Sequence, residues 1–106
     1  MDPQLIINEG TVTDWTDVDT SSLVGVGTTI VSLRIIEKSG ILGTQVWVRR
    51  NGDTTEVTPY RLIDNGSIFI ETSIDSNYTF QYKTDGTIDI RVTGFFSSSI
   101  PITITN

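Results

Sequence analysis

Two stretches decide the fold: residues 28–37, TTIVSLRIIE, and residues 87–96, TIDIRVTGFF. In both, apolar residues alternate with polar ones, and side chains two residues apart on a strand lie on the same face of a sheet. Each stretch therefore predicts a strand with one buried face. The residues expected to face inward are Val31, Leu33, Ile35, Ile88, Ile90 and Val92. The polar residues that alternate with the last three, Asp89, Arg91 and Thr93, are expected to face outward.

The composition of the whole chain supports the same interpretation. Of the 106 residues, 41 are Thr, Ile or Val, and Ala is absent. Side chains branched at Cβ fit a pleated sheet and lose freedom in a helix, so we expect almost no helix. Further strands are predicted wherever similar alternation recurs. The predicted strand segments are 4–8, 11–18, 23–26, 29–37, 44–50, 54–63, 67–73, 77–83, 87–95 and 100–105.

Eight to ten short strands, separated by turn residues, predict an all-β antiparallel two-sheet sandwich of jelly-roll type. We expect one domain over residues 1–106. Residues 1–10 would form an N-terminal arm or edge strand, and residues 97–106 a C-terminal strand-like tail. Asn51-Gly52 predicts a hairpin, because a type I′ turn needs positive φ at both central residues.

The composition also excludes several classes of function. The chain has no Cys and no His, which excludes disulfides, the usual zinc sites and triads that use imidazole. Its net charge of −6 argues against a nucleic-acid or anionic-lipid surface, which needs clustered Lys and Arg. No apolar run is long enough to cross a membrane, and residues after Met1 do not resemble a signal peptide. We expect a soluble chain, complete from Met1, without cofactors.

Acidic residues are the first candidates for chemistry. Asp14, Asp17 and Asp19 could offer oxygen ligands to calcium, but the spacing lacks the glycine and distal Glu of a calcium loop. A solvated acidic face is the favoured interpretation. Two carboxylates in a cleft could hydrolyse a glycoside, yet so short a chain leaves few residues to wall a cleft. We therefore expect no enzymatic activity.

Trp15 and Trp47 could stack on sugar rings, and Trp47 with Gln45 and Arg49 would resemble a binding platform if all three face outward. The favoured alternative is that Trp15 closes one end of the core and Trp47 packs against a neighbouring subunit, because tryptophan is enriched at interfaces. The five arginines are dispersed along the predicted strands. They are expected to form weak cross-strand pairs with acidic residues.

Both ends of the chain carry apolar β-type segments. They either pair with each other inside the domain or add a strand to a neighbouring molecule. Bare sheet edges promote association, so we expect assembly. The candidate interface residues are Leu5, Ile6, Ile7, Trp47, Ile100, Ile102 and Ile104.

An ordered set of motifs also resembles a known family. The motifs are WTDVDTSSLVGVGTTIVSLRIIEKSG (15–40), VWVRRNGDT (46–54), YRLIDNG (60–66) and TDGTIDIRVTGFF (84–96). Together they resemble a small β-sandwich module of tailed-phage virion proteins. The chain departs from that pattern in having VWVRRNG where V-G-V-R-x-N-G is usual, and in its extra tail after Phe96. The resemblance implies that the fold depends on Trp15, Asp17, Asp19, Asn51, Gly52 and Gly94.

The resemblance implies a virion structural protein, a capsid decoration or cement protein on the capsid surface, assembled in the host cytoplasm. Its expected partners are the major capsid protein and further copies of itself, as a trimer on a local three-fold axis. The alternative is a carbohydrate- or receptor-binding module of a head or tail fibre, which would bind a surface glycan.

Overall fold

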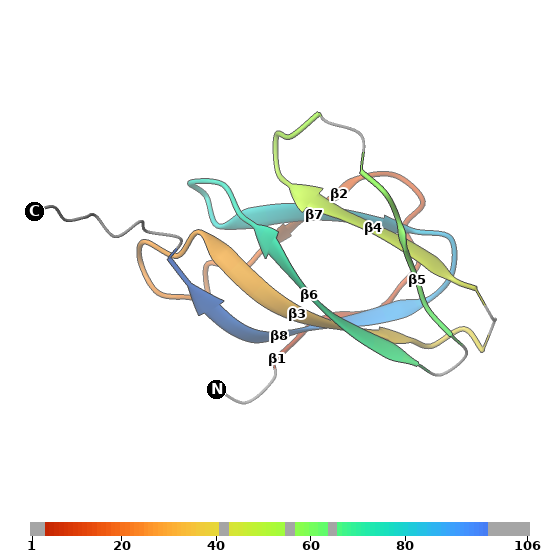
Figure 1. Ribbon diagram of the computed structural model, residues 1–106. Coiled ribbons are helices and arrows are strands. Elements are labelled where there is room, and N and C mark those ends of the chain that lie inside the picture. The colour runs from red at the N-terminus through yellow and green to blue at the C-terminus, as the bar shows by residue number, and fades with distance from the viewer. Residues whose placement is uncertain (1–3, 41–42, 55–56, 64–65, 98–106) are drawn as a thin grey trace, which may run out of the picture.

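The computed structural model describes residues 4–40, 43–54, 57–63 and 66–97, and these form two stacked antiparallel sheets (Figure 1). No helix of the length and hydropathy needed to cross a membrane occurs among these residues. The eight strands are β1 (Gln4–Gly10), β2 (Thr16–Asp19), β3 (Ile30–Glu37), β4 (Gln45–Arg50), β5 (Tyr60–Arg61), β6 (Ser67–Ser73), β7 (Thr79–Thr84) and β8 (Ile88–Phe96).

The strand order confirms the predicted jelly-roll sandwich. One sheet has the order β1-β8-β3-β6 and the other β2-β7-β4-β5. Strands β1 and β8, β2 and β7, β3 and β6, and β4 and β5 each pair antiparallel, as in one long hairpin whose successive pairs fall in alternate sheets. This is the winding of a jelly roll. It places β6 at one edge of the first sheet and β5 at the corresponding edge of the second.

The core lies between the sheets and follows the predicted alternation. All six residues expected to face inward from β3 and β8 are fully buried, as are Val46 and Phe80 of the other sheet. Tyr82 and Val48 are also buried. Period-two burial is what stacked sheets require, because alternate side chains point into the gap between them.

One predicted strand is wrong, and two are shorter than predicted. Residues 23–26 form turns instead, closed by a hydrogen bond from Thr28 N–H to the Gly25 carbonyl, and Gly27 has a φ of +87°. Of the described residues in 54–63, only Tyr60–Arg61 form a strand, and the strand predicted at 11–18 begins only at Thr16, as β2 (Thr16–Asp19). The segment 100–105 lies outside the described residues.

The turn at Asn51-Gly52 also differs from the prediction. Asp53 N–H bonds to the Arg50 carbonyl, which closes a four-residue turn, but positive φ occurs only at Gly52 (+88°) and not at Asn51. A type I′ turn needs both. The turn therefore opens a wide loop, and the next strand begins only at Tyr60.

The N-terminal segment forms an edge strand of its own domain. Strand β1 pairs with β8, and Ile6 and Ile7 pack against the core, so of the three predicted N-terminal interface residues only Leu5 is exposed. The register shifts twice along this pair. At the second shift Glu9 has a φ of +54° and its N–H bonds to Asp89 Oδ1 at 2.8 Å.

That irregular edge overturns the expectation that Asp89 faces solvent. The side chain is buried, because β1 folds over it and supplies the Glu9 N–H as a hydrogen-bond donor. Next to it, Gly10 approaches the opposite sheet closely: a Cβ there would overlap the Tyr82 hydroxyl and lie 2.6 Å from Ile7 Cγ2. Burial raises the pKa of Tyr82.

Glu37 is a buried acid at the end of β3, and it organises the connection to β4. Its carboxylate accepts hydrogen bonds from Ser39 N–H (2.6 Å), Gly40 N–H (3.0 Å) and Thr44 Oγ1 (3.3 Å), and a further one from the Ser39 hydroxyl. Donors of this number satisfy a carboxylate removed from water. Glu37 thus fixes the path of the chain between the two sheets.

Candidate functional site

The outer side of sheet β2-β7-β4-β5 carries the strongest concentration of aromatic and cationic side chains. We call Trp15, Trp47, Arg49 and Lys83 the tryptophan face. In the register of β4 and β7, Trp47 lies opposite Lys83, and Trp15 immediately precedes β2 on the other side of β7. Lys83 Nζ is 5.0 Å from the Trp15 ring centroid and 5.2 Å from that of Trp47. The jelly-roll order therefore brings together two tryptophans that are 32 residues apart.

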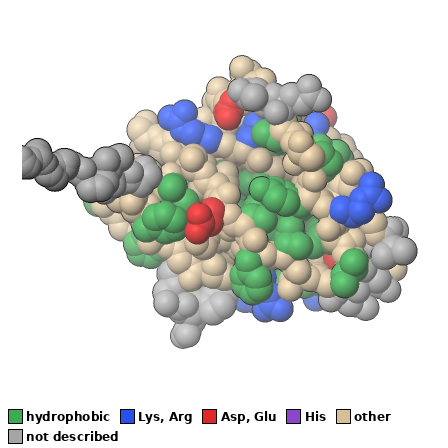
Figure 2. Space-filling view, viewed as in Figure 1, with side chains coloured by type: hydrophobic (Ala, Val, Ile, Leu, Met, Phe, Trp, Pro, Cys, Tyr) green, Lys and Arg blue, Asp and Glu red, His purple; other side chains and the backbone are tan. Residues whose placement is uncertain are grey.

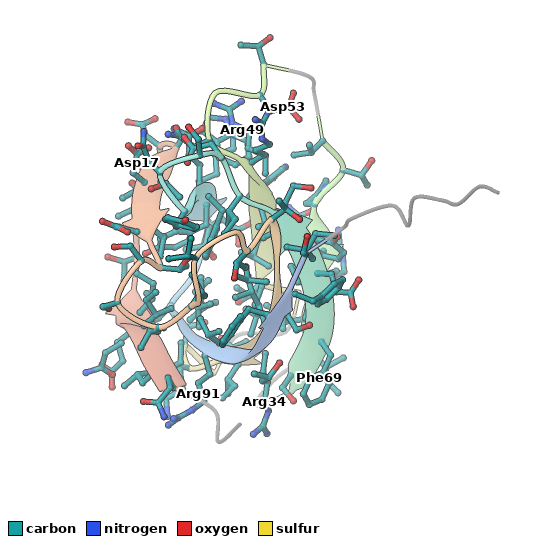
Figure 3. The ribbon with its side chains drawn as sticks, turned by 90° about the vertical axis from the view of Figure 1, so that its left-hand side faces the viewer. Asp17, Arg34, Arg49, Asp53, Phe69 and Arg91 are labelled. Carbon is teal, nitrogen blue, oxygen red and sulfur yellow. The ribbon has the colours of Figure 1, made fainter. Side chains whose placement is uncertain are left out.

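Arg49 connects this face to a polar row. Its guanidinium lies over the Trp15 ring, with Cζ 3.9 Å from the centroid, and its Nε donates to Gln81 Oε1 at 2.8 Å. Gln81 Nε2 in turn donates to Asp17 Oδ1 at 2.8 Å. Figure 3 shows Asp17 and Arg49 at the same end of this layer. The hydrogen bonds of the row Arg49, Gln81, Asp17 hold the guanidinium over the indole.

The tryptophan face combines the groups that bind a planar or ring-shaped polar ligand. Both indoles are half-buried. Trp15 does not belong to the core cluster, so the expectation that it closes one end of the core is wrong, and Trp47 is neither fully exposed nor enclosed. Trp47, Gln45 and Arg49 do share the outward face, as the platform interpretation required. Indole faces attract cations and apolar ring surfaces, and here cations already contact them.

The acidic cluster extends along β2, which carries Asp17 and Asp19, and the bend before it, which carries Asp14, and each described contact is made to a protein donor. Asp19 Oδ1 accepts the Ser21 N–H at 2.8 Å, and this hydrogen bond lowers the pKa of Asp19. Asp17 accepts from Gln81, and Asp14 caps Thr16 through its backbone carbonyl. Within the described ranges, no three acidic, His or Cys side chains converge as a metal site.

Asn51 donates a hydrogen bond to a carboxylate that is distant in sequence. Asp75 begins the turn between β6 and β7, where its Oδ1 accepts N–H groups of Asn77 and Thr79 and its Oδ2 accepts Asn51 Nδ2 at 2.8 Å. Desolvation raises the pKa of Asp75, but these hydrogen bonds and the charge of Arg50 outweigh it and lower the pKa overall. Asn51 therefore ties the β4–β5 loop to the β6–β7 turn.

Of the two glycines that are expected to determine the fold, one occupies a backbone conformation that requires glycine and the other does not. Gly52 has its left-handed φ, which disfavours any side chain. Gly94 lies where the β3–β8 register shifts, but a Cβ there would meet only Ser32 Cβ, at 4.0 Å. Space alone does not require glycine at position 94.

Two open hollows lie outside the tryptophan face. One, of about 370 Å³, is at the end of the sandwich between Gly27, Arg50, Asp75 and Tyr78, and the Tyr78 hydroxyl accepts the Gly27 N–H at 3.2 Å. The other, of about 440 Å³, lies beside β6 and is lined in part by Phe69 and Glu71. The lining of each hollow includes one carboxylate rather than the pair that glycoside hydrolysis uses.

The outer face of the other sheet carries a row of cations and an exposed aromatic ring. In the register, Arg91 lies opposite Arg34, and Arg34 lies opposite Phe69 (Figure 3). The expectation that the arginines pair with acidic residues across the strands is wrong for Arg34 and Arg91. The strand order, and not the local sequence, determines which residue lies opposite each arginine. Arg34 lies over the Phe69 ring, 5.8 Å from its centroid, and Phe69 is 71% exposed.

A third surface lies where β8 ends. Phe95, Phe96 and Val26 are all exposed there, Val26 to 99%. The loop that carries Val26 reaches this strand end, because Thr29 N–H bonds to the Phe96 carbonyl and a Cβ on Gly25 would lie 3.5 Å from Phe95 Cε2. We call Val26, Phe95 and Phe96 the tail-end patch. The predicted interface residues Ile100, Ile102 and Ile104 follow it and lie outside the described residues.

Comparison with known proteins does not identify the chain. No family model, curated protein or solved structure matches the chain. The resemblance to phage virion modules thus rests on the ordered motifs themselves.

Proposed function

We propose that the chain is a virion structural protein of a tailed phage, a capsid decoration or cement protein that binds the assembled shell. The ordered motifs support this proposal, since they fall on successive elements of one sandwich: 15–40 on β2 and β3, 46–54 on β4 and its turn, and 84–96 on β8. Jelly rolls recur in viral capsid and lectin domains. That recurrence is an analogy of fold and does not assign a role.

The observation that carries the proposal is the tail-end patch. Three exposed apolar side chains lie around the point where β8 ends, and the sequence that follows at 100–105 is the apolar β-type segment IPITIT. Apolar area removed from water contributes roughly 25 cal/mol per Å². The patch and the following segment would bind the major capsid protein, while the net charge of −6 would keep decorated particles apart. A trimer on a local three-fold axis is the expected arrangement.

Co-sedimentation with purified shells tests this proposal. The wild-type chain should pellet with shells, whereas a chain lacking residues 97–106 and the double variant Phe95→Ser/Phe96→Ser should stay in the supernatant while keeping a folded circular dichroism spectrum. Tyr60→Ser is the matched control, because it also removes an exposed aromatic side chain but from β5, the edge strand of the other sheet. Unchanged shell binding by the truncated chain would contradict the proposal.

The tryptophan face favours one alternative function, a carbohydrate- or receptor-binding module. A sugar ring could stack on the indoles of Trp15 and Trp47, and Lys83 between them would pair with a sugar carboxylate. This function predicts that Trp47→Ala abolishes glycan binding without changing the oligomeric state. A wild-type chain that binds nothing on an array of neutral and acidic glycans would remove the alternative.

A further inference from the structure

Strand β6 presents a bare sheet edge. Among the residues that the structure describes it pairs with β3 alone, and it is seven residues long, whereas the edge strand β5 of the other sheet has two residues and β1 is broken by register shifts. Long regular edges with few charges are the ones that recruit another strand. Figure 2 shows apolar side chains exposed beside β6, between the two sheets.

The hydrogen bonds at both ends of β6 show which backbone groups face this edge. Gly66 accepts the Glu37 N–H, and Ile74 N–H bonds to the Thr29 carbonyl, both across the β3–β6 pair. Hydrogen-bonded positions alternate along an antiparallel pair, so the even-numbered residues of β6 bond to β3. The N–H and C=O groups of Ser67, Phe69, Glu71 and Ser73 therefore point away from the sheet.

We propose that two copies of the chain pair through β6, antiparallel and around a two-fold axis at Phe69, to form a continuous eight-stranded sheet. In this register Phe69 lies opposite its symmetry mate, and Ser67 lies opposite Glu71 of the second copy. About six backbone hydrogen bonds would form between the outward-facing groups. Half-buried Ile68 and Ile70, on the inner side of β6, would be covered by the same residues of the second copy.

Charge complementarity selects this register and the second copy as occupant. Arg34 Nε donates to Ser67 Oγ at 3.4 Å, so the guanidinium already lies beside the position that Glu71 of the second copy would face. Arg34 has another cation, Arg91, directly opposite on β8, and like charges in that position repel. A carboxylate arriving next to Ser67 relieves this repulsion, and the two-fold axis makes the Arg34–Glu71 contact twice.

The inference is independent of the proposed virion role, since it concerns the isolated chain. It also differs from the expected trimer, because an edge that pairs with itself closes as a dimer. An edge pair buries less than the roughly 1,200 Å² of standard interfaces, so the association is expected to be weak and concentration-dependent.

Sedimentation equilibrium on the full chain, from micromolar to millimolar concentration, tests the pairing. The wild type should approach twice its 11.7 kDa mass. Glu71→Arg and Arg34→Glu should each raise the dimer dissociation constant about tenfold or more, and the charge-swapped double variant should restore it to within about threefold. Lys83→Glu is the matched control: it makes the same change from a cation to a carboxylate, but on the outer face of the other sheet, and should leave the dimer in place.

Circular dichroism spectra of all variants show whether each is folded, and Arg34 and Glu71 both lie on the outer face of the sheet. A wild-type chain that stays monomeric at about 1 mM, or one that forms trimers, would overturn the inference. So would a dimer that Glu71→Arg and Arg34→Glu leave unchanged, or a double variant that is no better than either single one.

Discussion

Replacing Glu37 should lower the free energy of unfolding of the domain substantially. Glu37→Ala removes the acceptor of two backbone N–H groups and two hydroxyls at a side chain that is 1% exposed. Hydrogen bonds to a charged group contribute about 1.5–3 kcal/mol each, but desolvation of the carboxylate offsets much of their sum. A net loss of about 2–4 kcal/mol in the free energy of unfolding follows, a large share of the 5–15 kcal/mol typical of a domain.

Urea denaturation followed by tryptophan fluorescence measures this loss, with the slope of the transition checked for two-state behaviour. Glu37→Gln should lose about half as much, because the amide keeps one acceptor oxygen but turns a donor toward the Gly40 N–H. Glu71→Ala is the control, since that carboxylate is exposed, and at micromolar concentration it should change stability by less than about 0.5 kcal/mol. If Glu37→Ala fell within the same limit, the account of a carboxylate that fixes the β3–β4 connection would be refuted.

Three further substitutions test other parts of the structure. Gly10→Ala should cost about 1–3 kcal/mol because its Cβ overlaps the Tyr82 hydroxyl, and thermal melts should show a smaller cost in a Tyr82→Phe background; equal costs in both would contradict the close approach. The lowered pKa of Asp75 means that it stabilises the fold above the ordinary aspartate pKa of 3.8 and that this contribution disappears as the pH falls through the lower folded-state value. Asp75→Asn should therefore cost about 1 kcal/mol at neutral pH and flatten the loss of stability between about pH 5 and pH 2, and an unchanged acid profile would count against it. In a chain with Trp15 as its sole tryptophan, Arg49→Ala should shift the fluorescence maximum and cost about 0.5–1 kcal/mol; an unaltered spectrum would mean that the guanidinium does not stack on the indole.

The core could be predicted from the sequence because burial in a sheet has a period of two. The six inward residues of β3 and β8 follow from alternation alone, and so does the outward direction of Trp47. The same alternation extends to Glu37, which continues the series of Val31, Leu33 and Ile35, although its charge argued against burial. The Ser39-Gly40 turn that follows supplies hydrogen-bond donors to the Glu37 carboxylate, and this turn was the feature of the sequence that could have indicated its burial.

Features that depend on distant partners could not be predicted. Asp89 is buried because the irregular end of β1 supplies a donor, and nothing near Asp89 in sequence indicates that. The meeting of Trp15, Lys83 and Trp47 depends on β7 lying between β2 and β4, and the repulsion of Arg34 and Arg91 depends on β3 lying next to β8. Strand order is a property of the whole chain, so these sites emerge only from the assembled sandwich.

The copy number of the chain in purified phage particles tests the central claim most directly. Quantitative mass spectrometry against the major capsid protein would give it, and symmetry makes the number decisive. Decoration of the capsid lattice predicts on the order of hundreds of copies per particle. A count of roughly three to a few tens would place the chain in a fibre or tail, and absence from the particle would contradict the virion role itself.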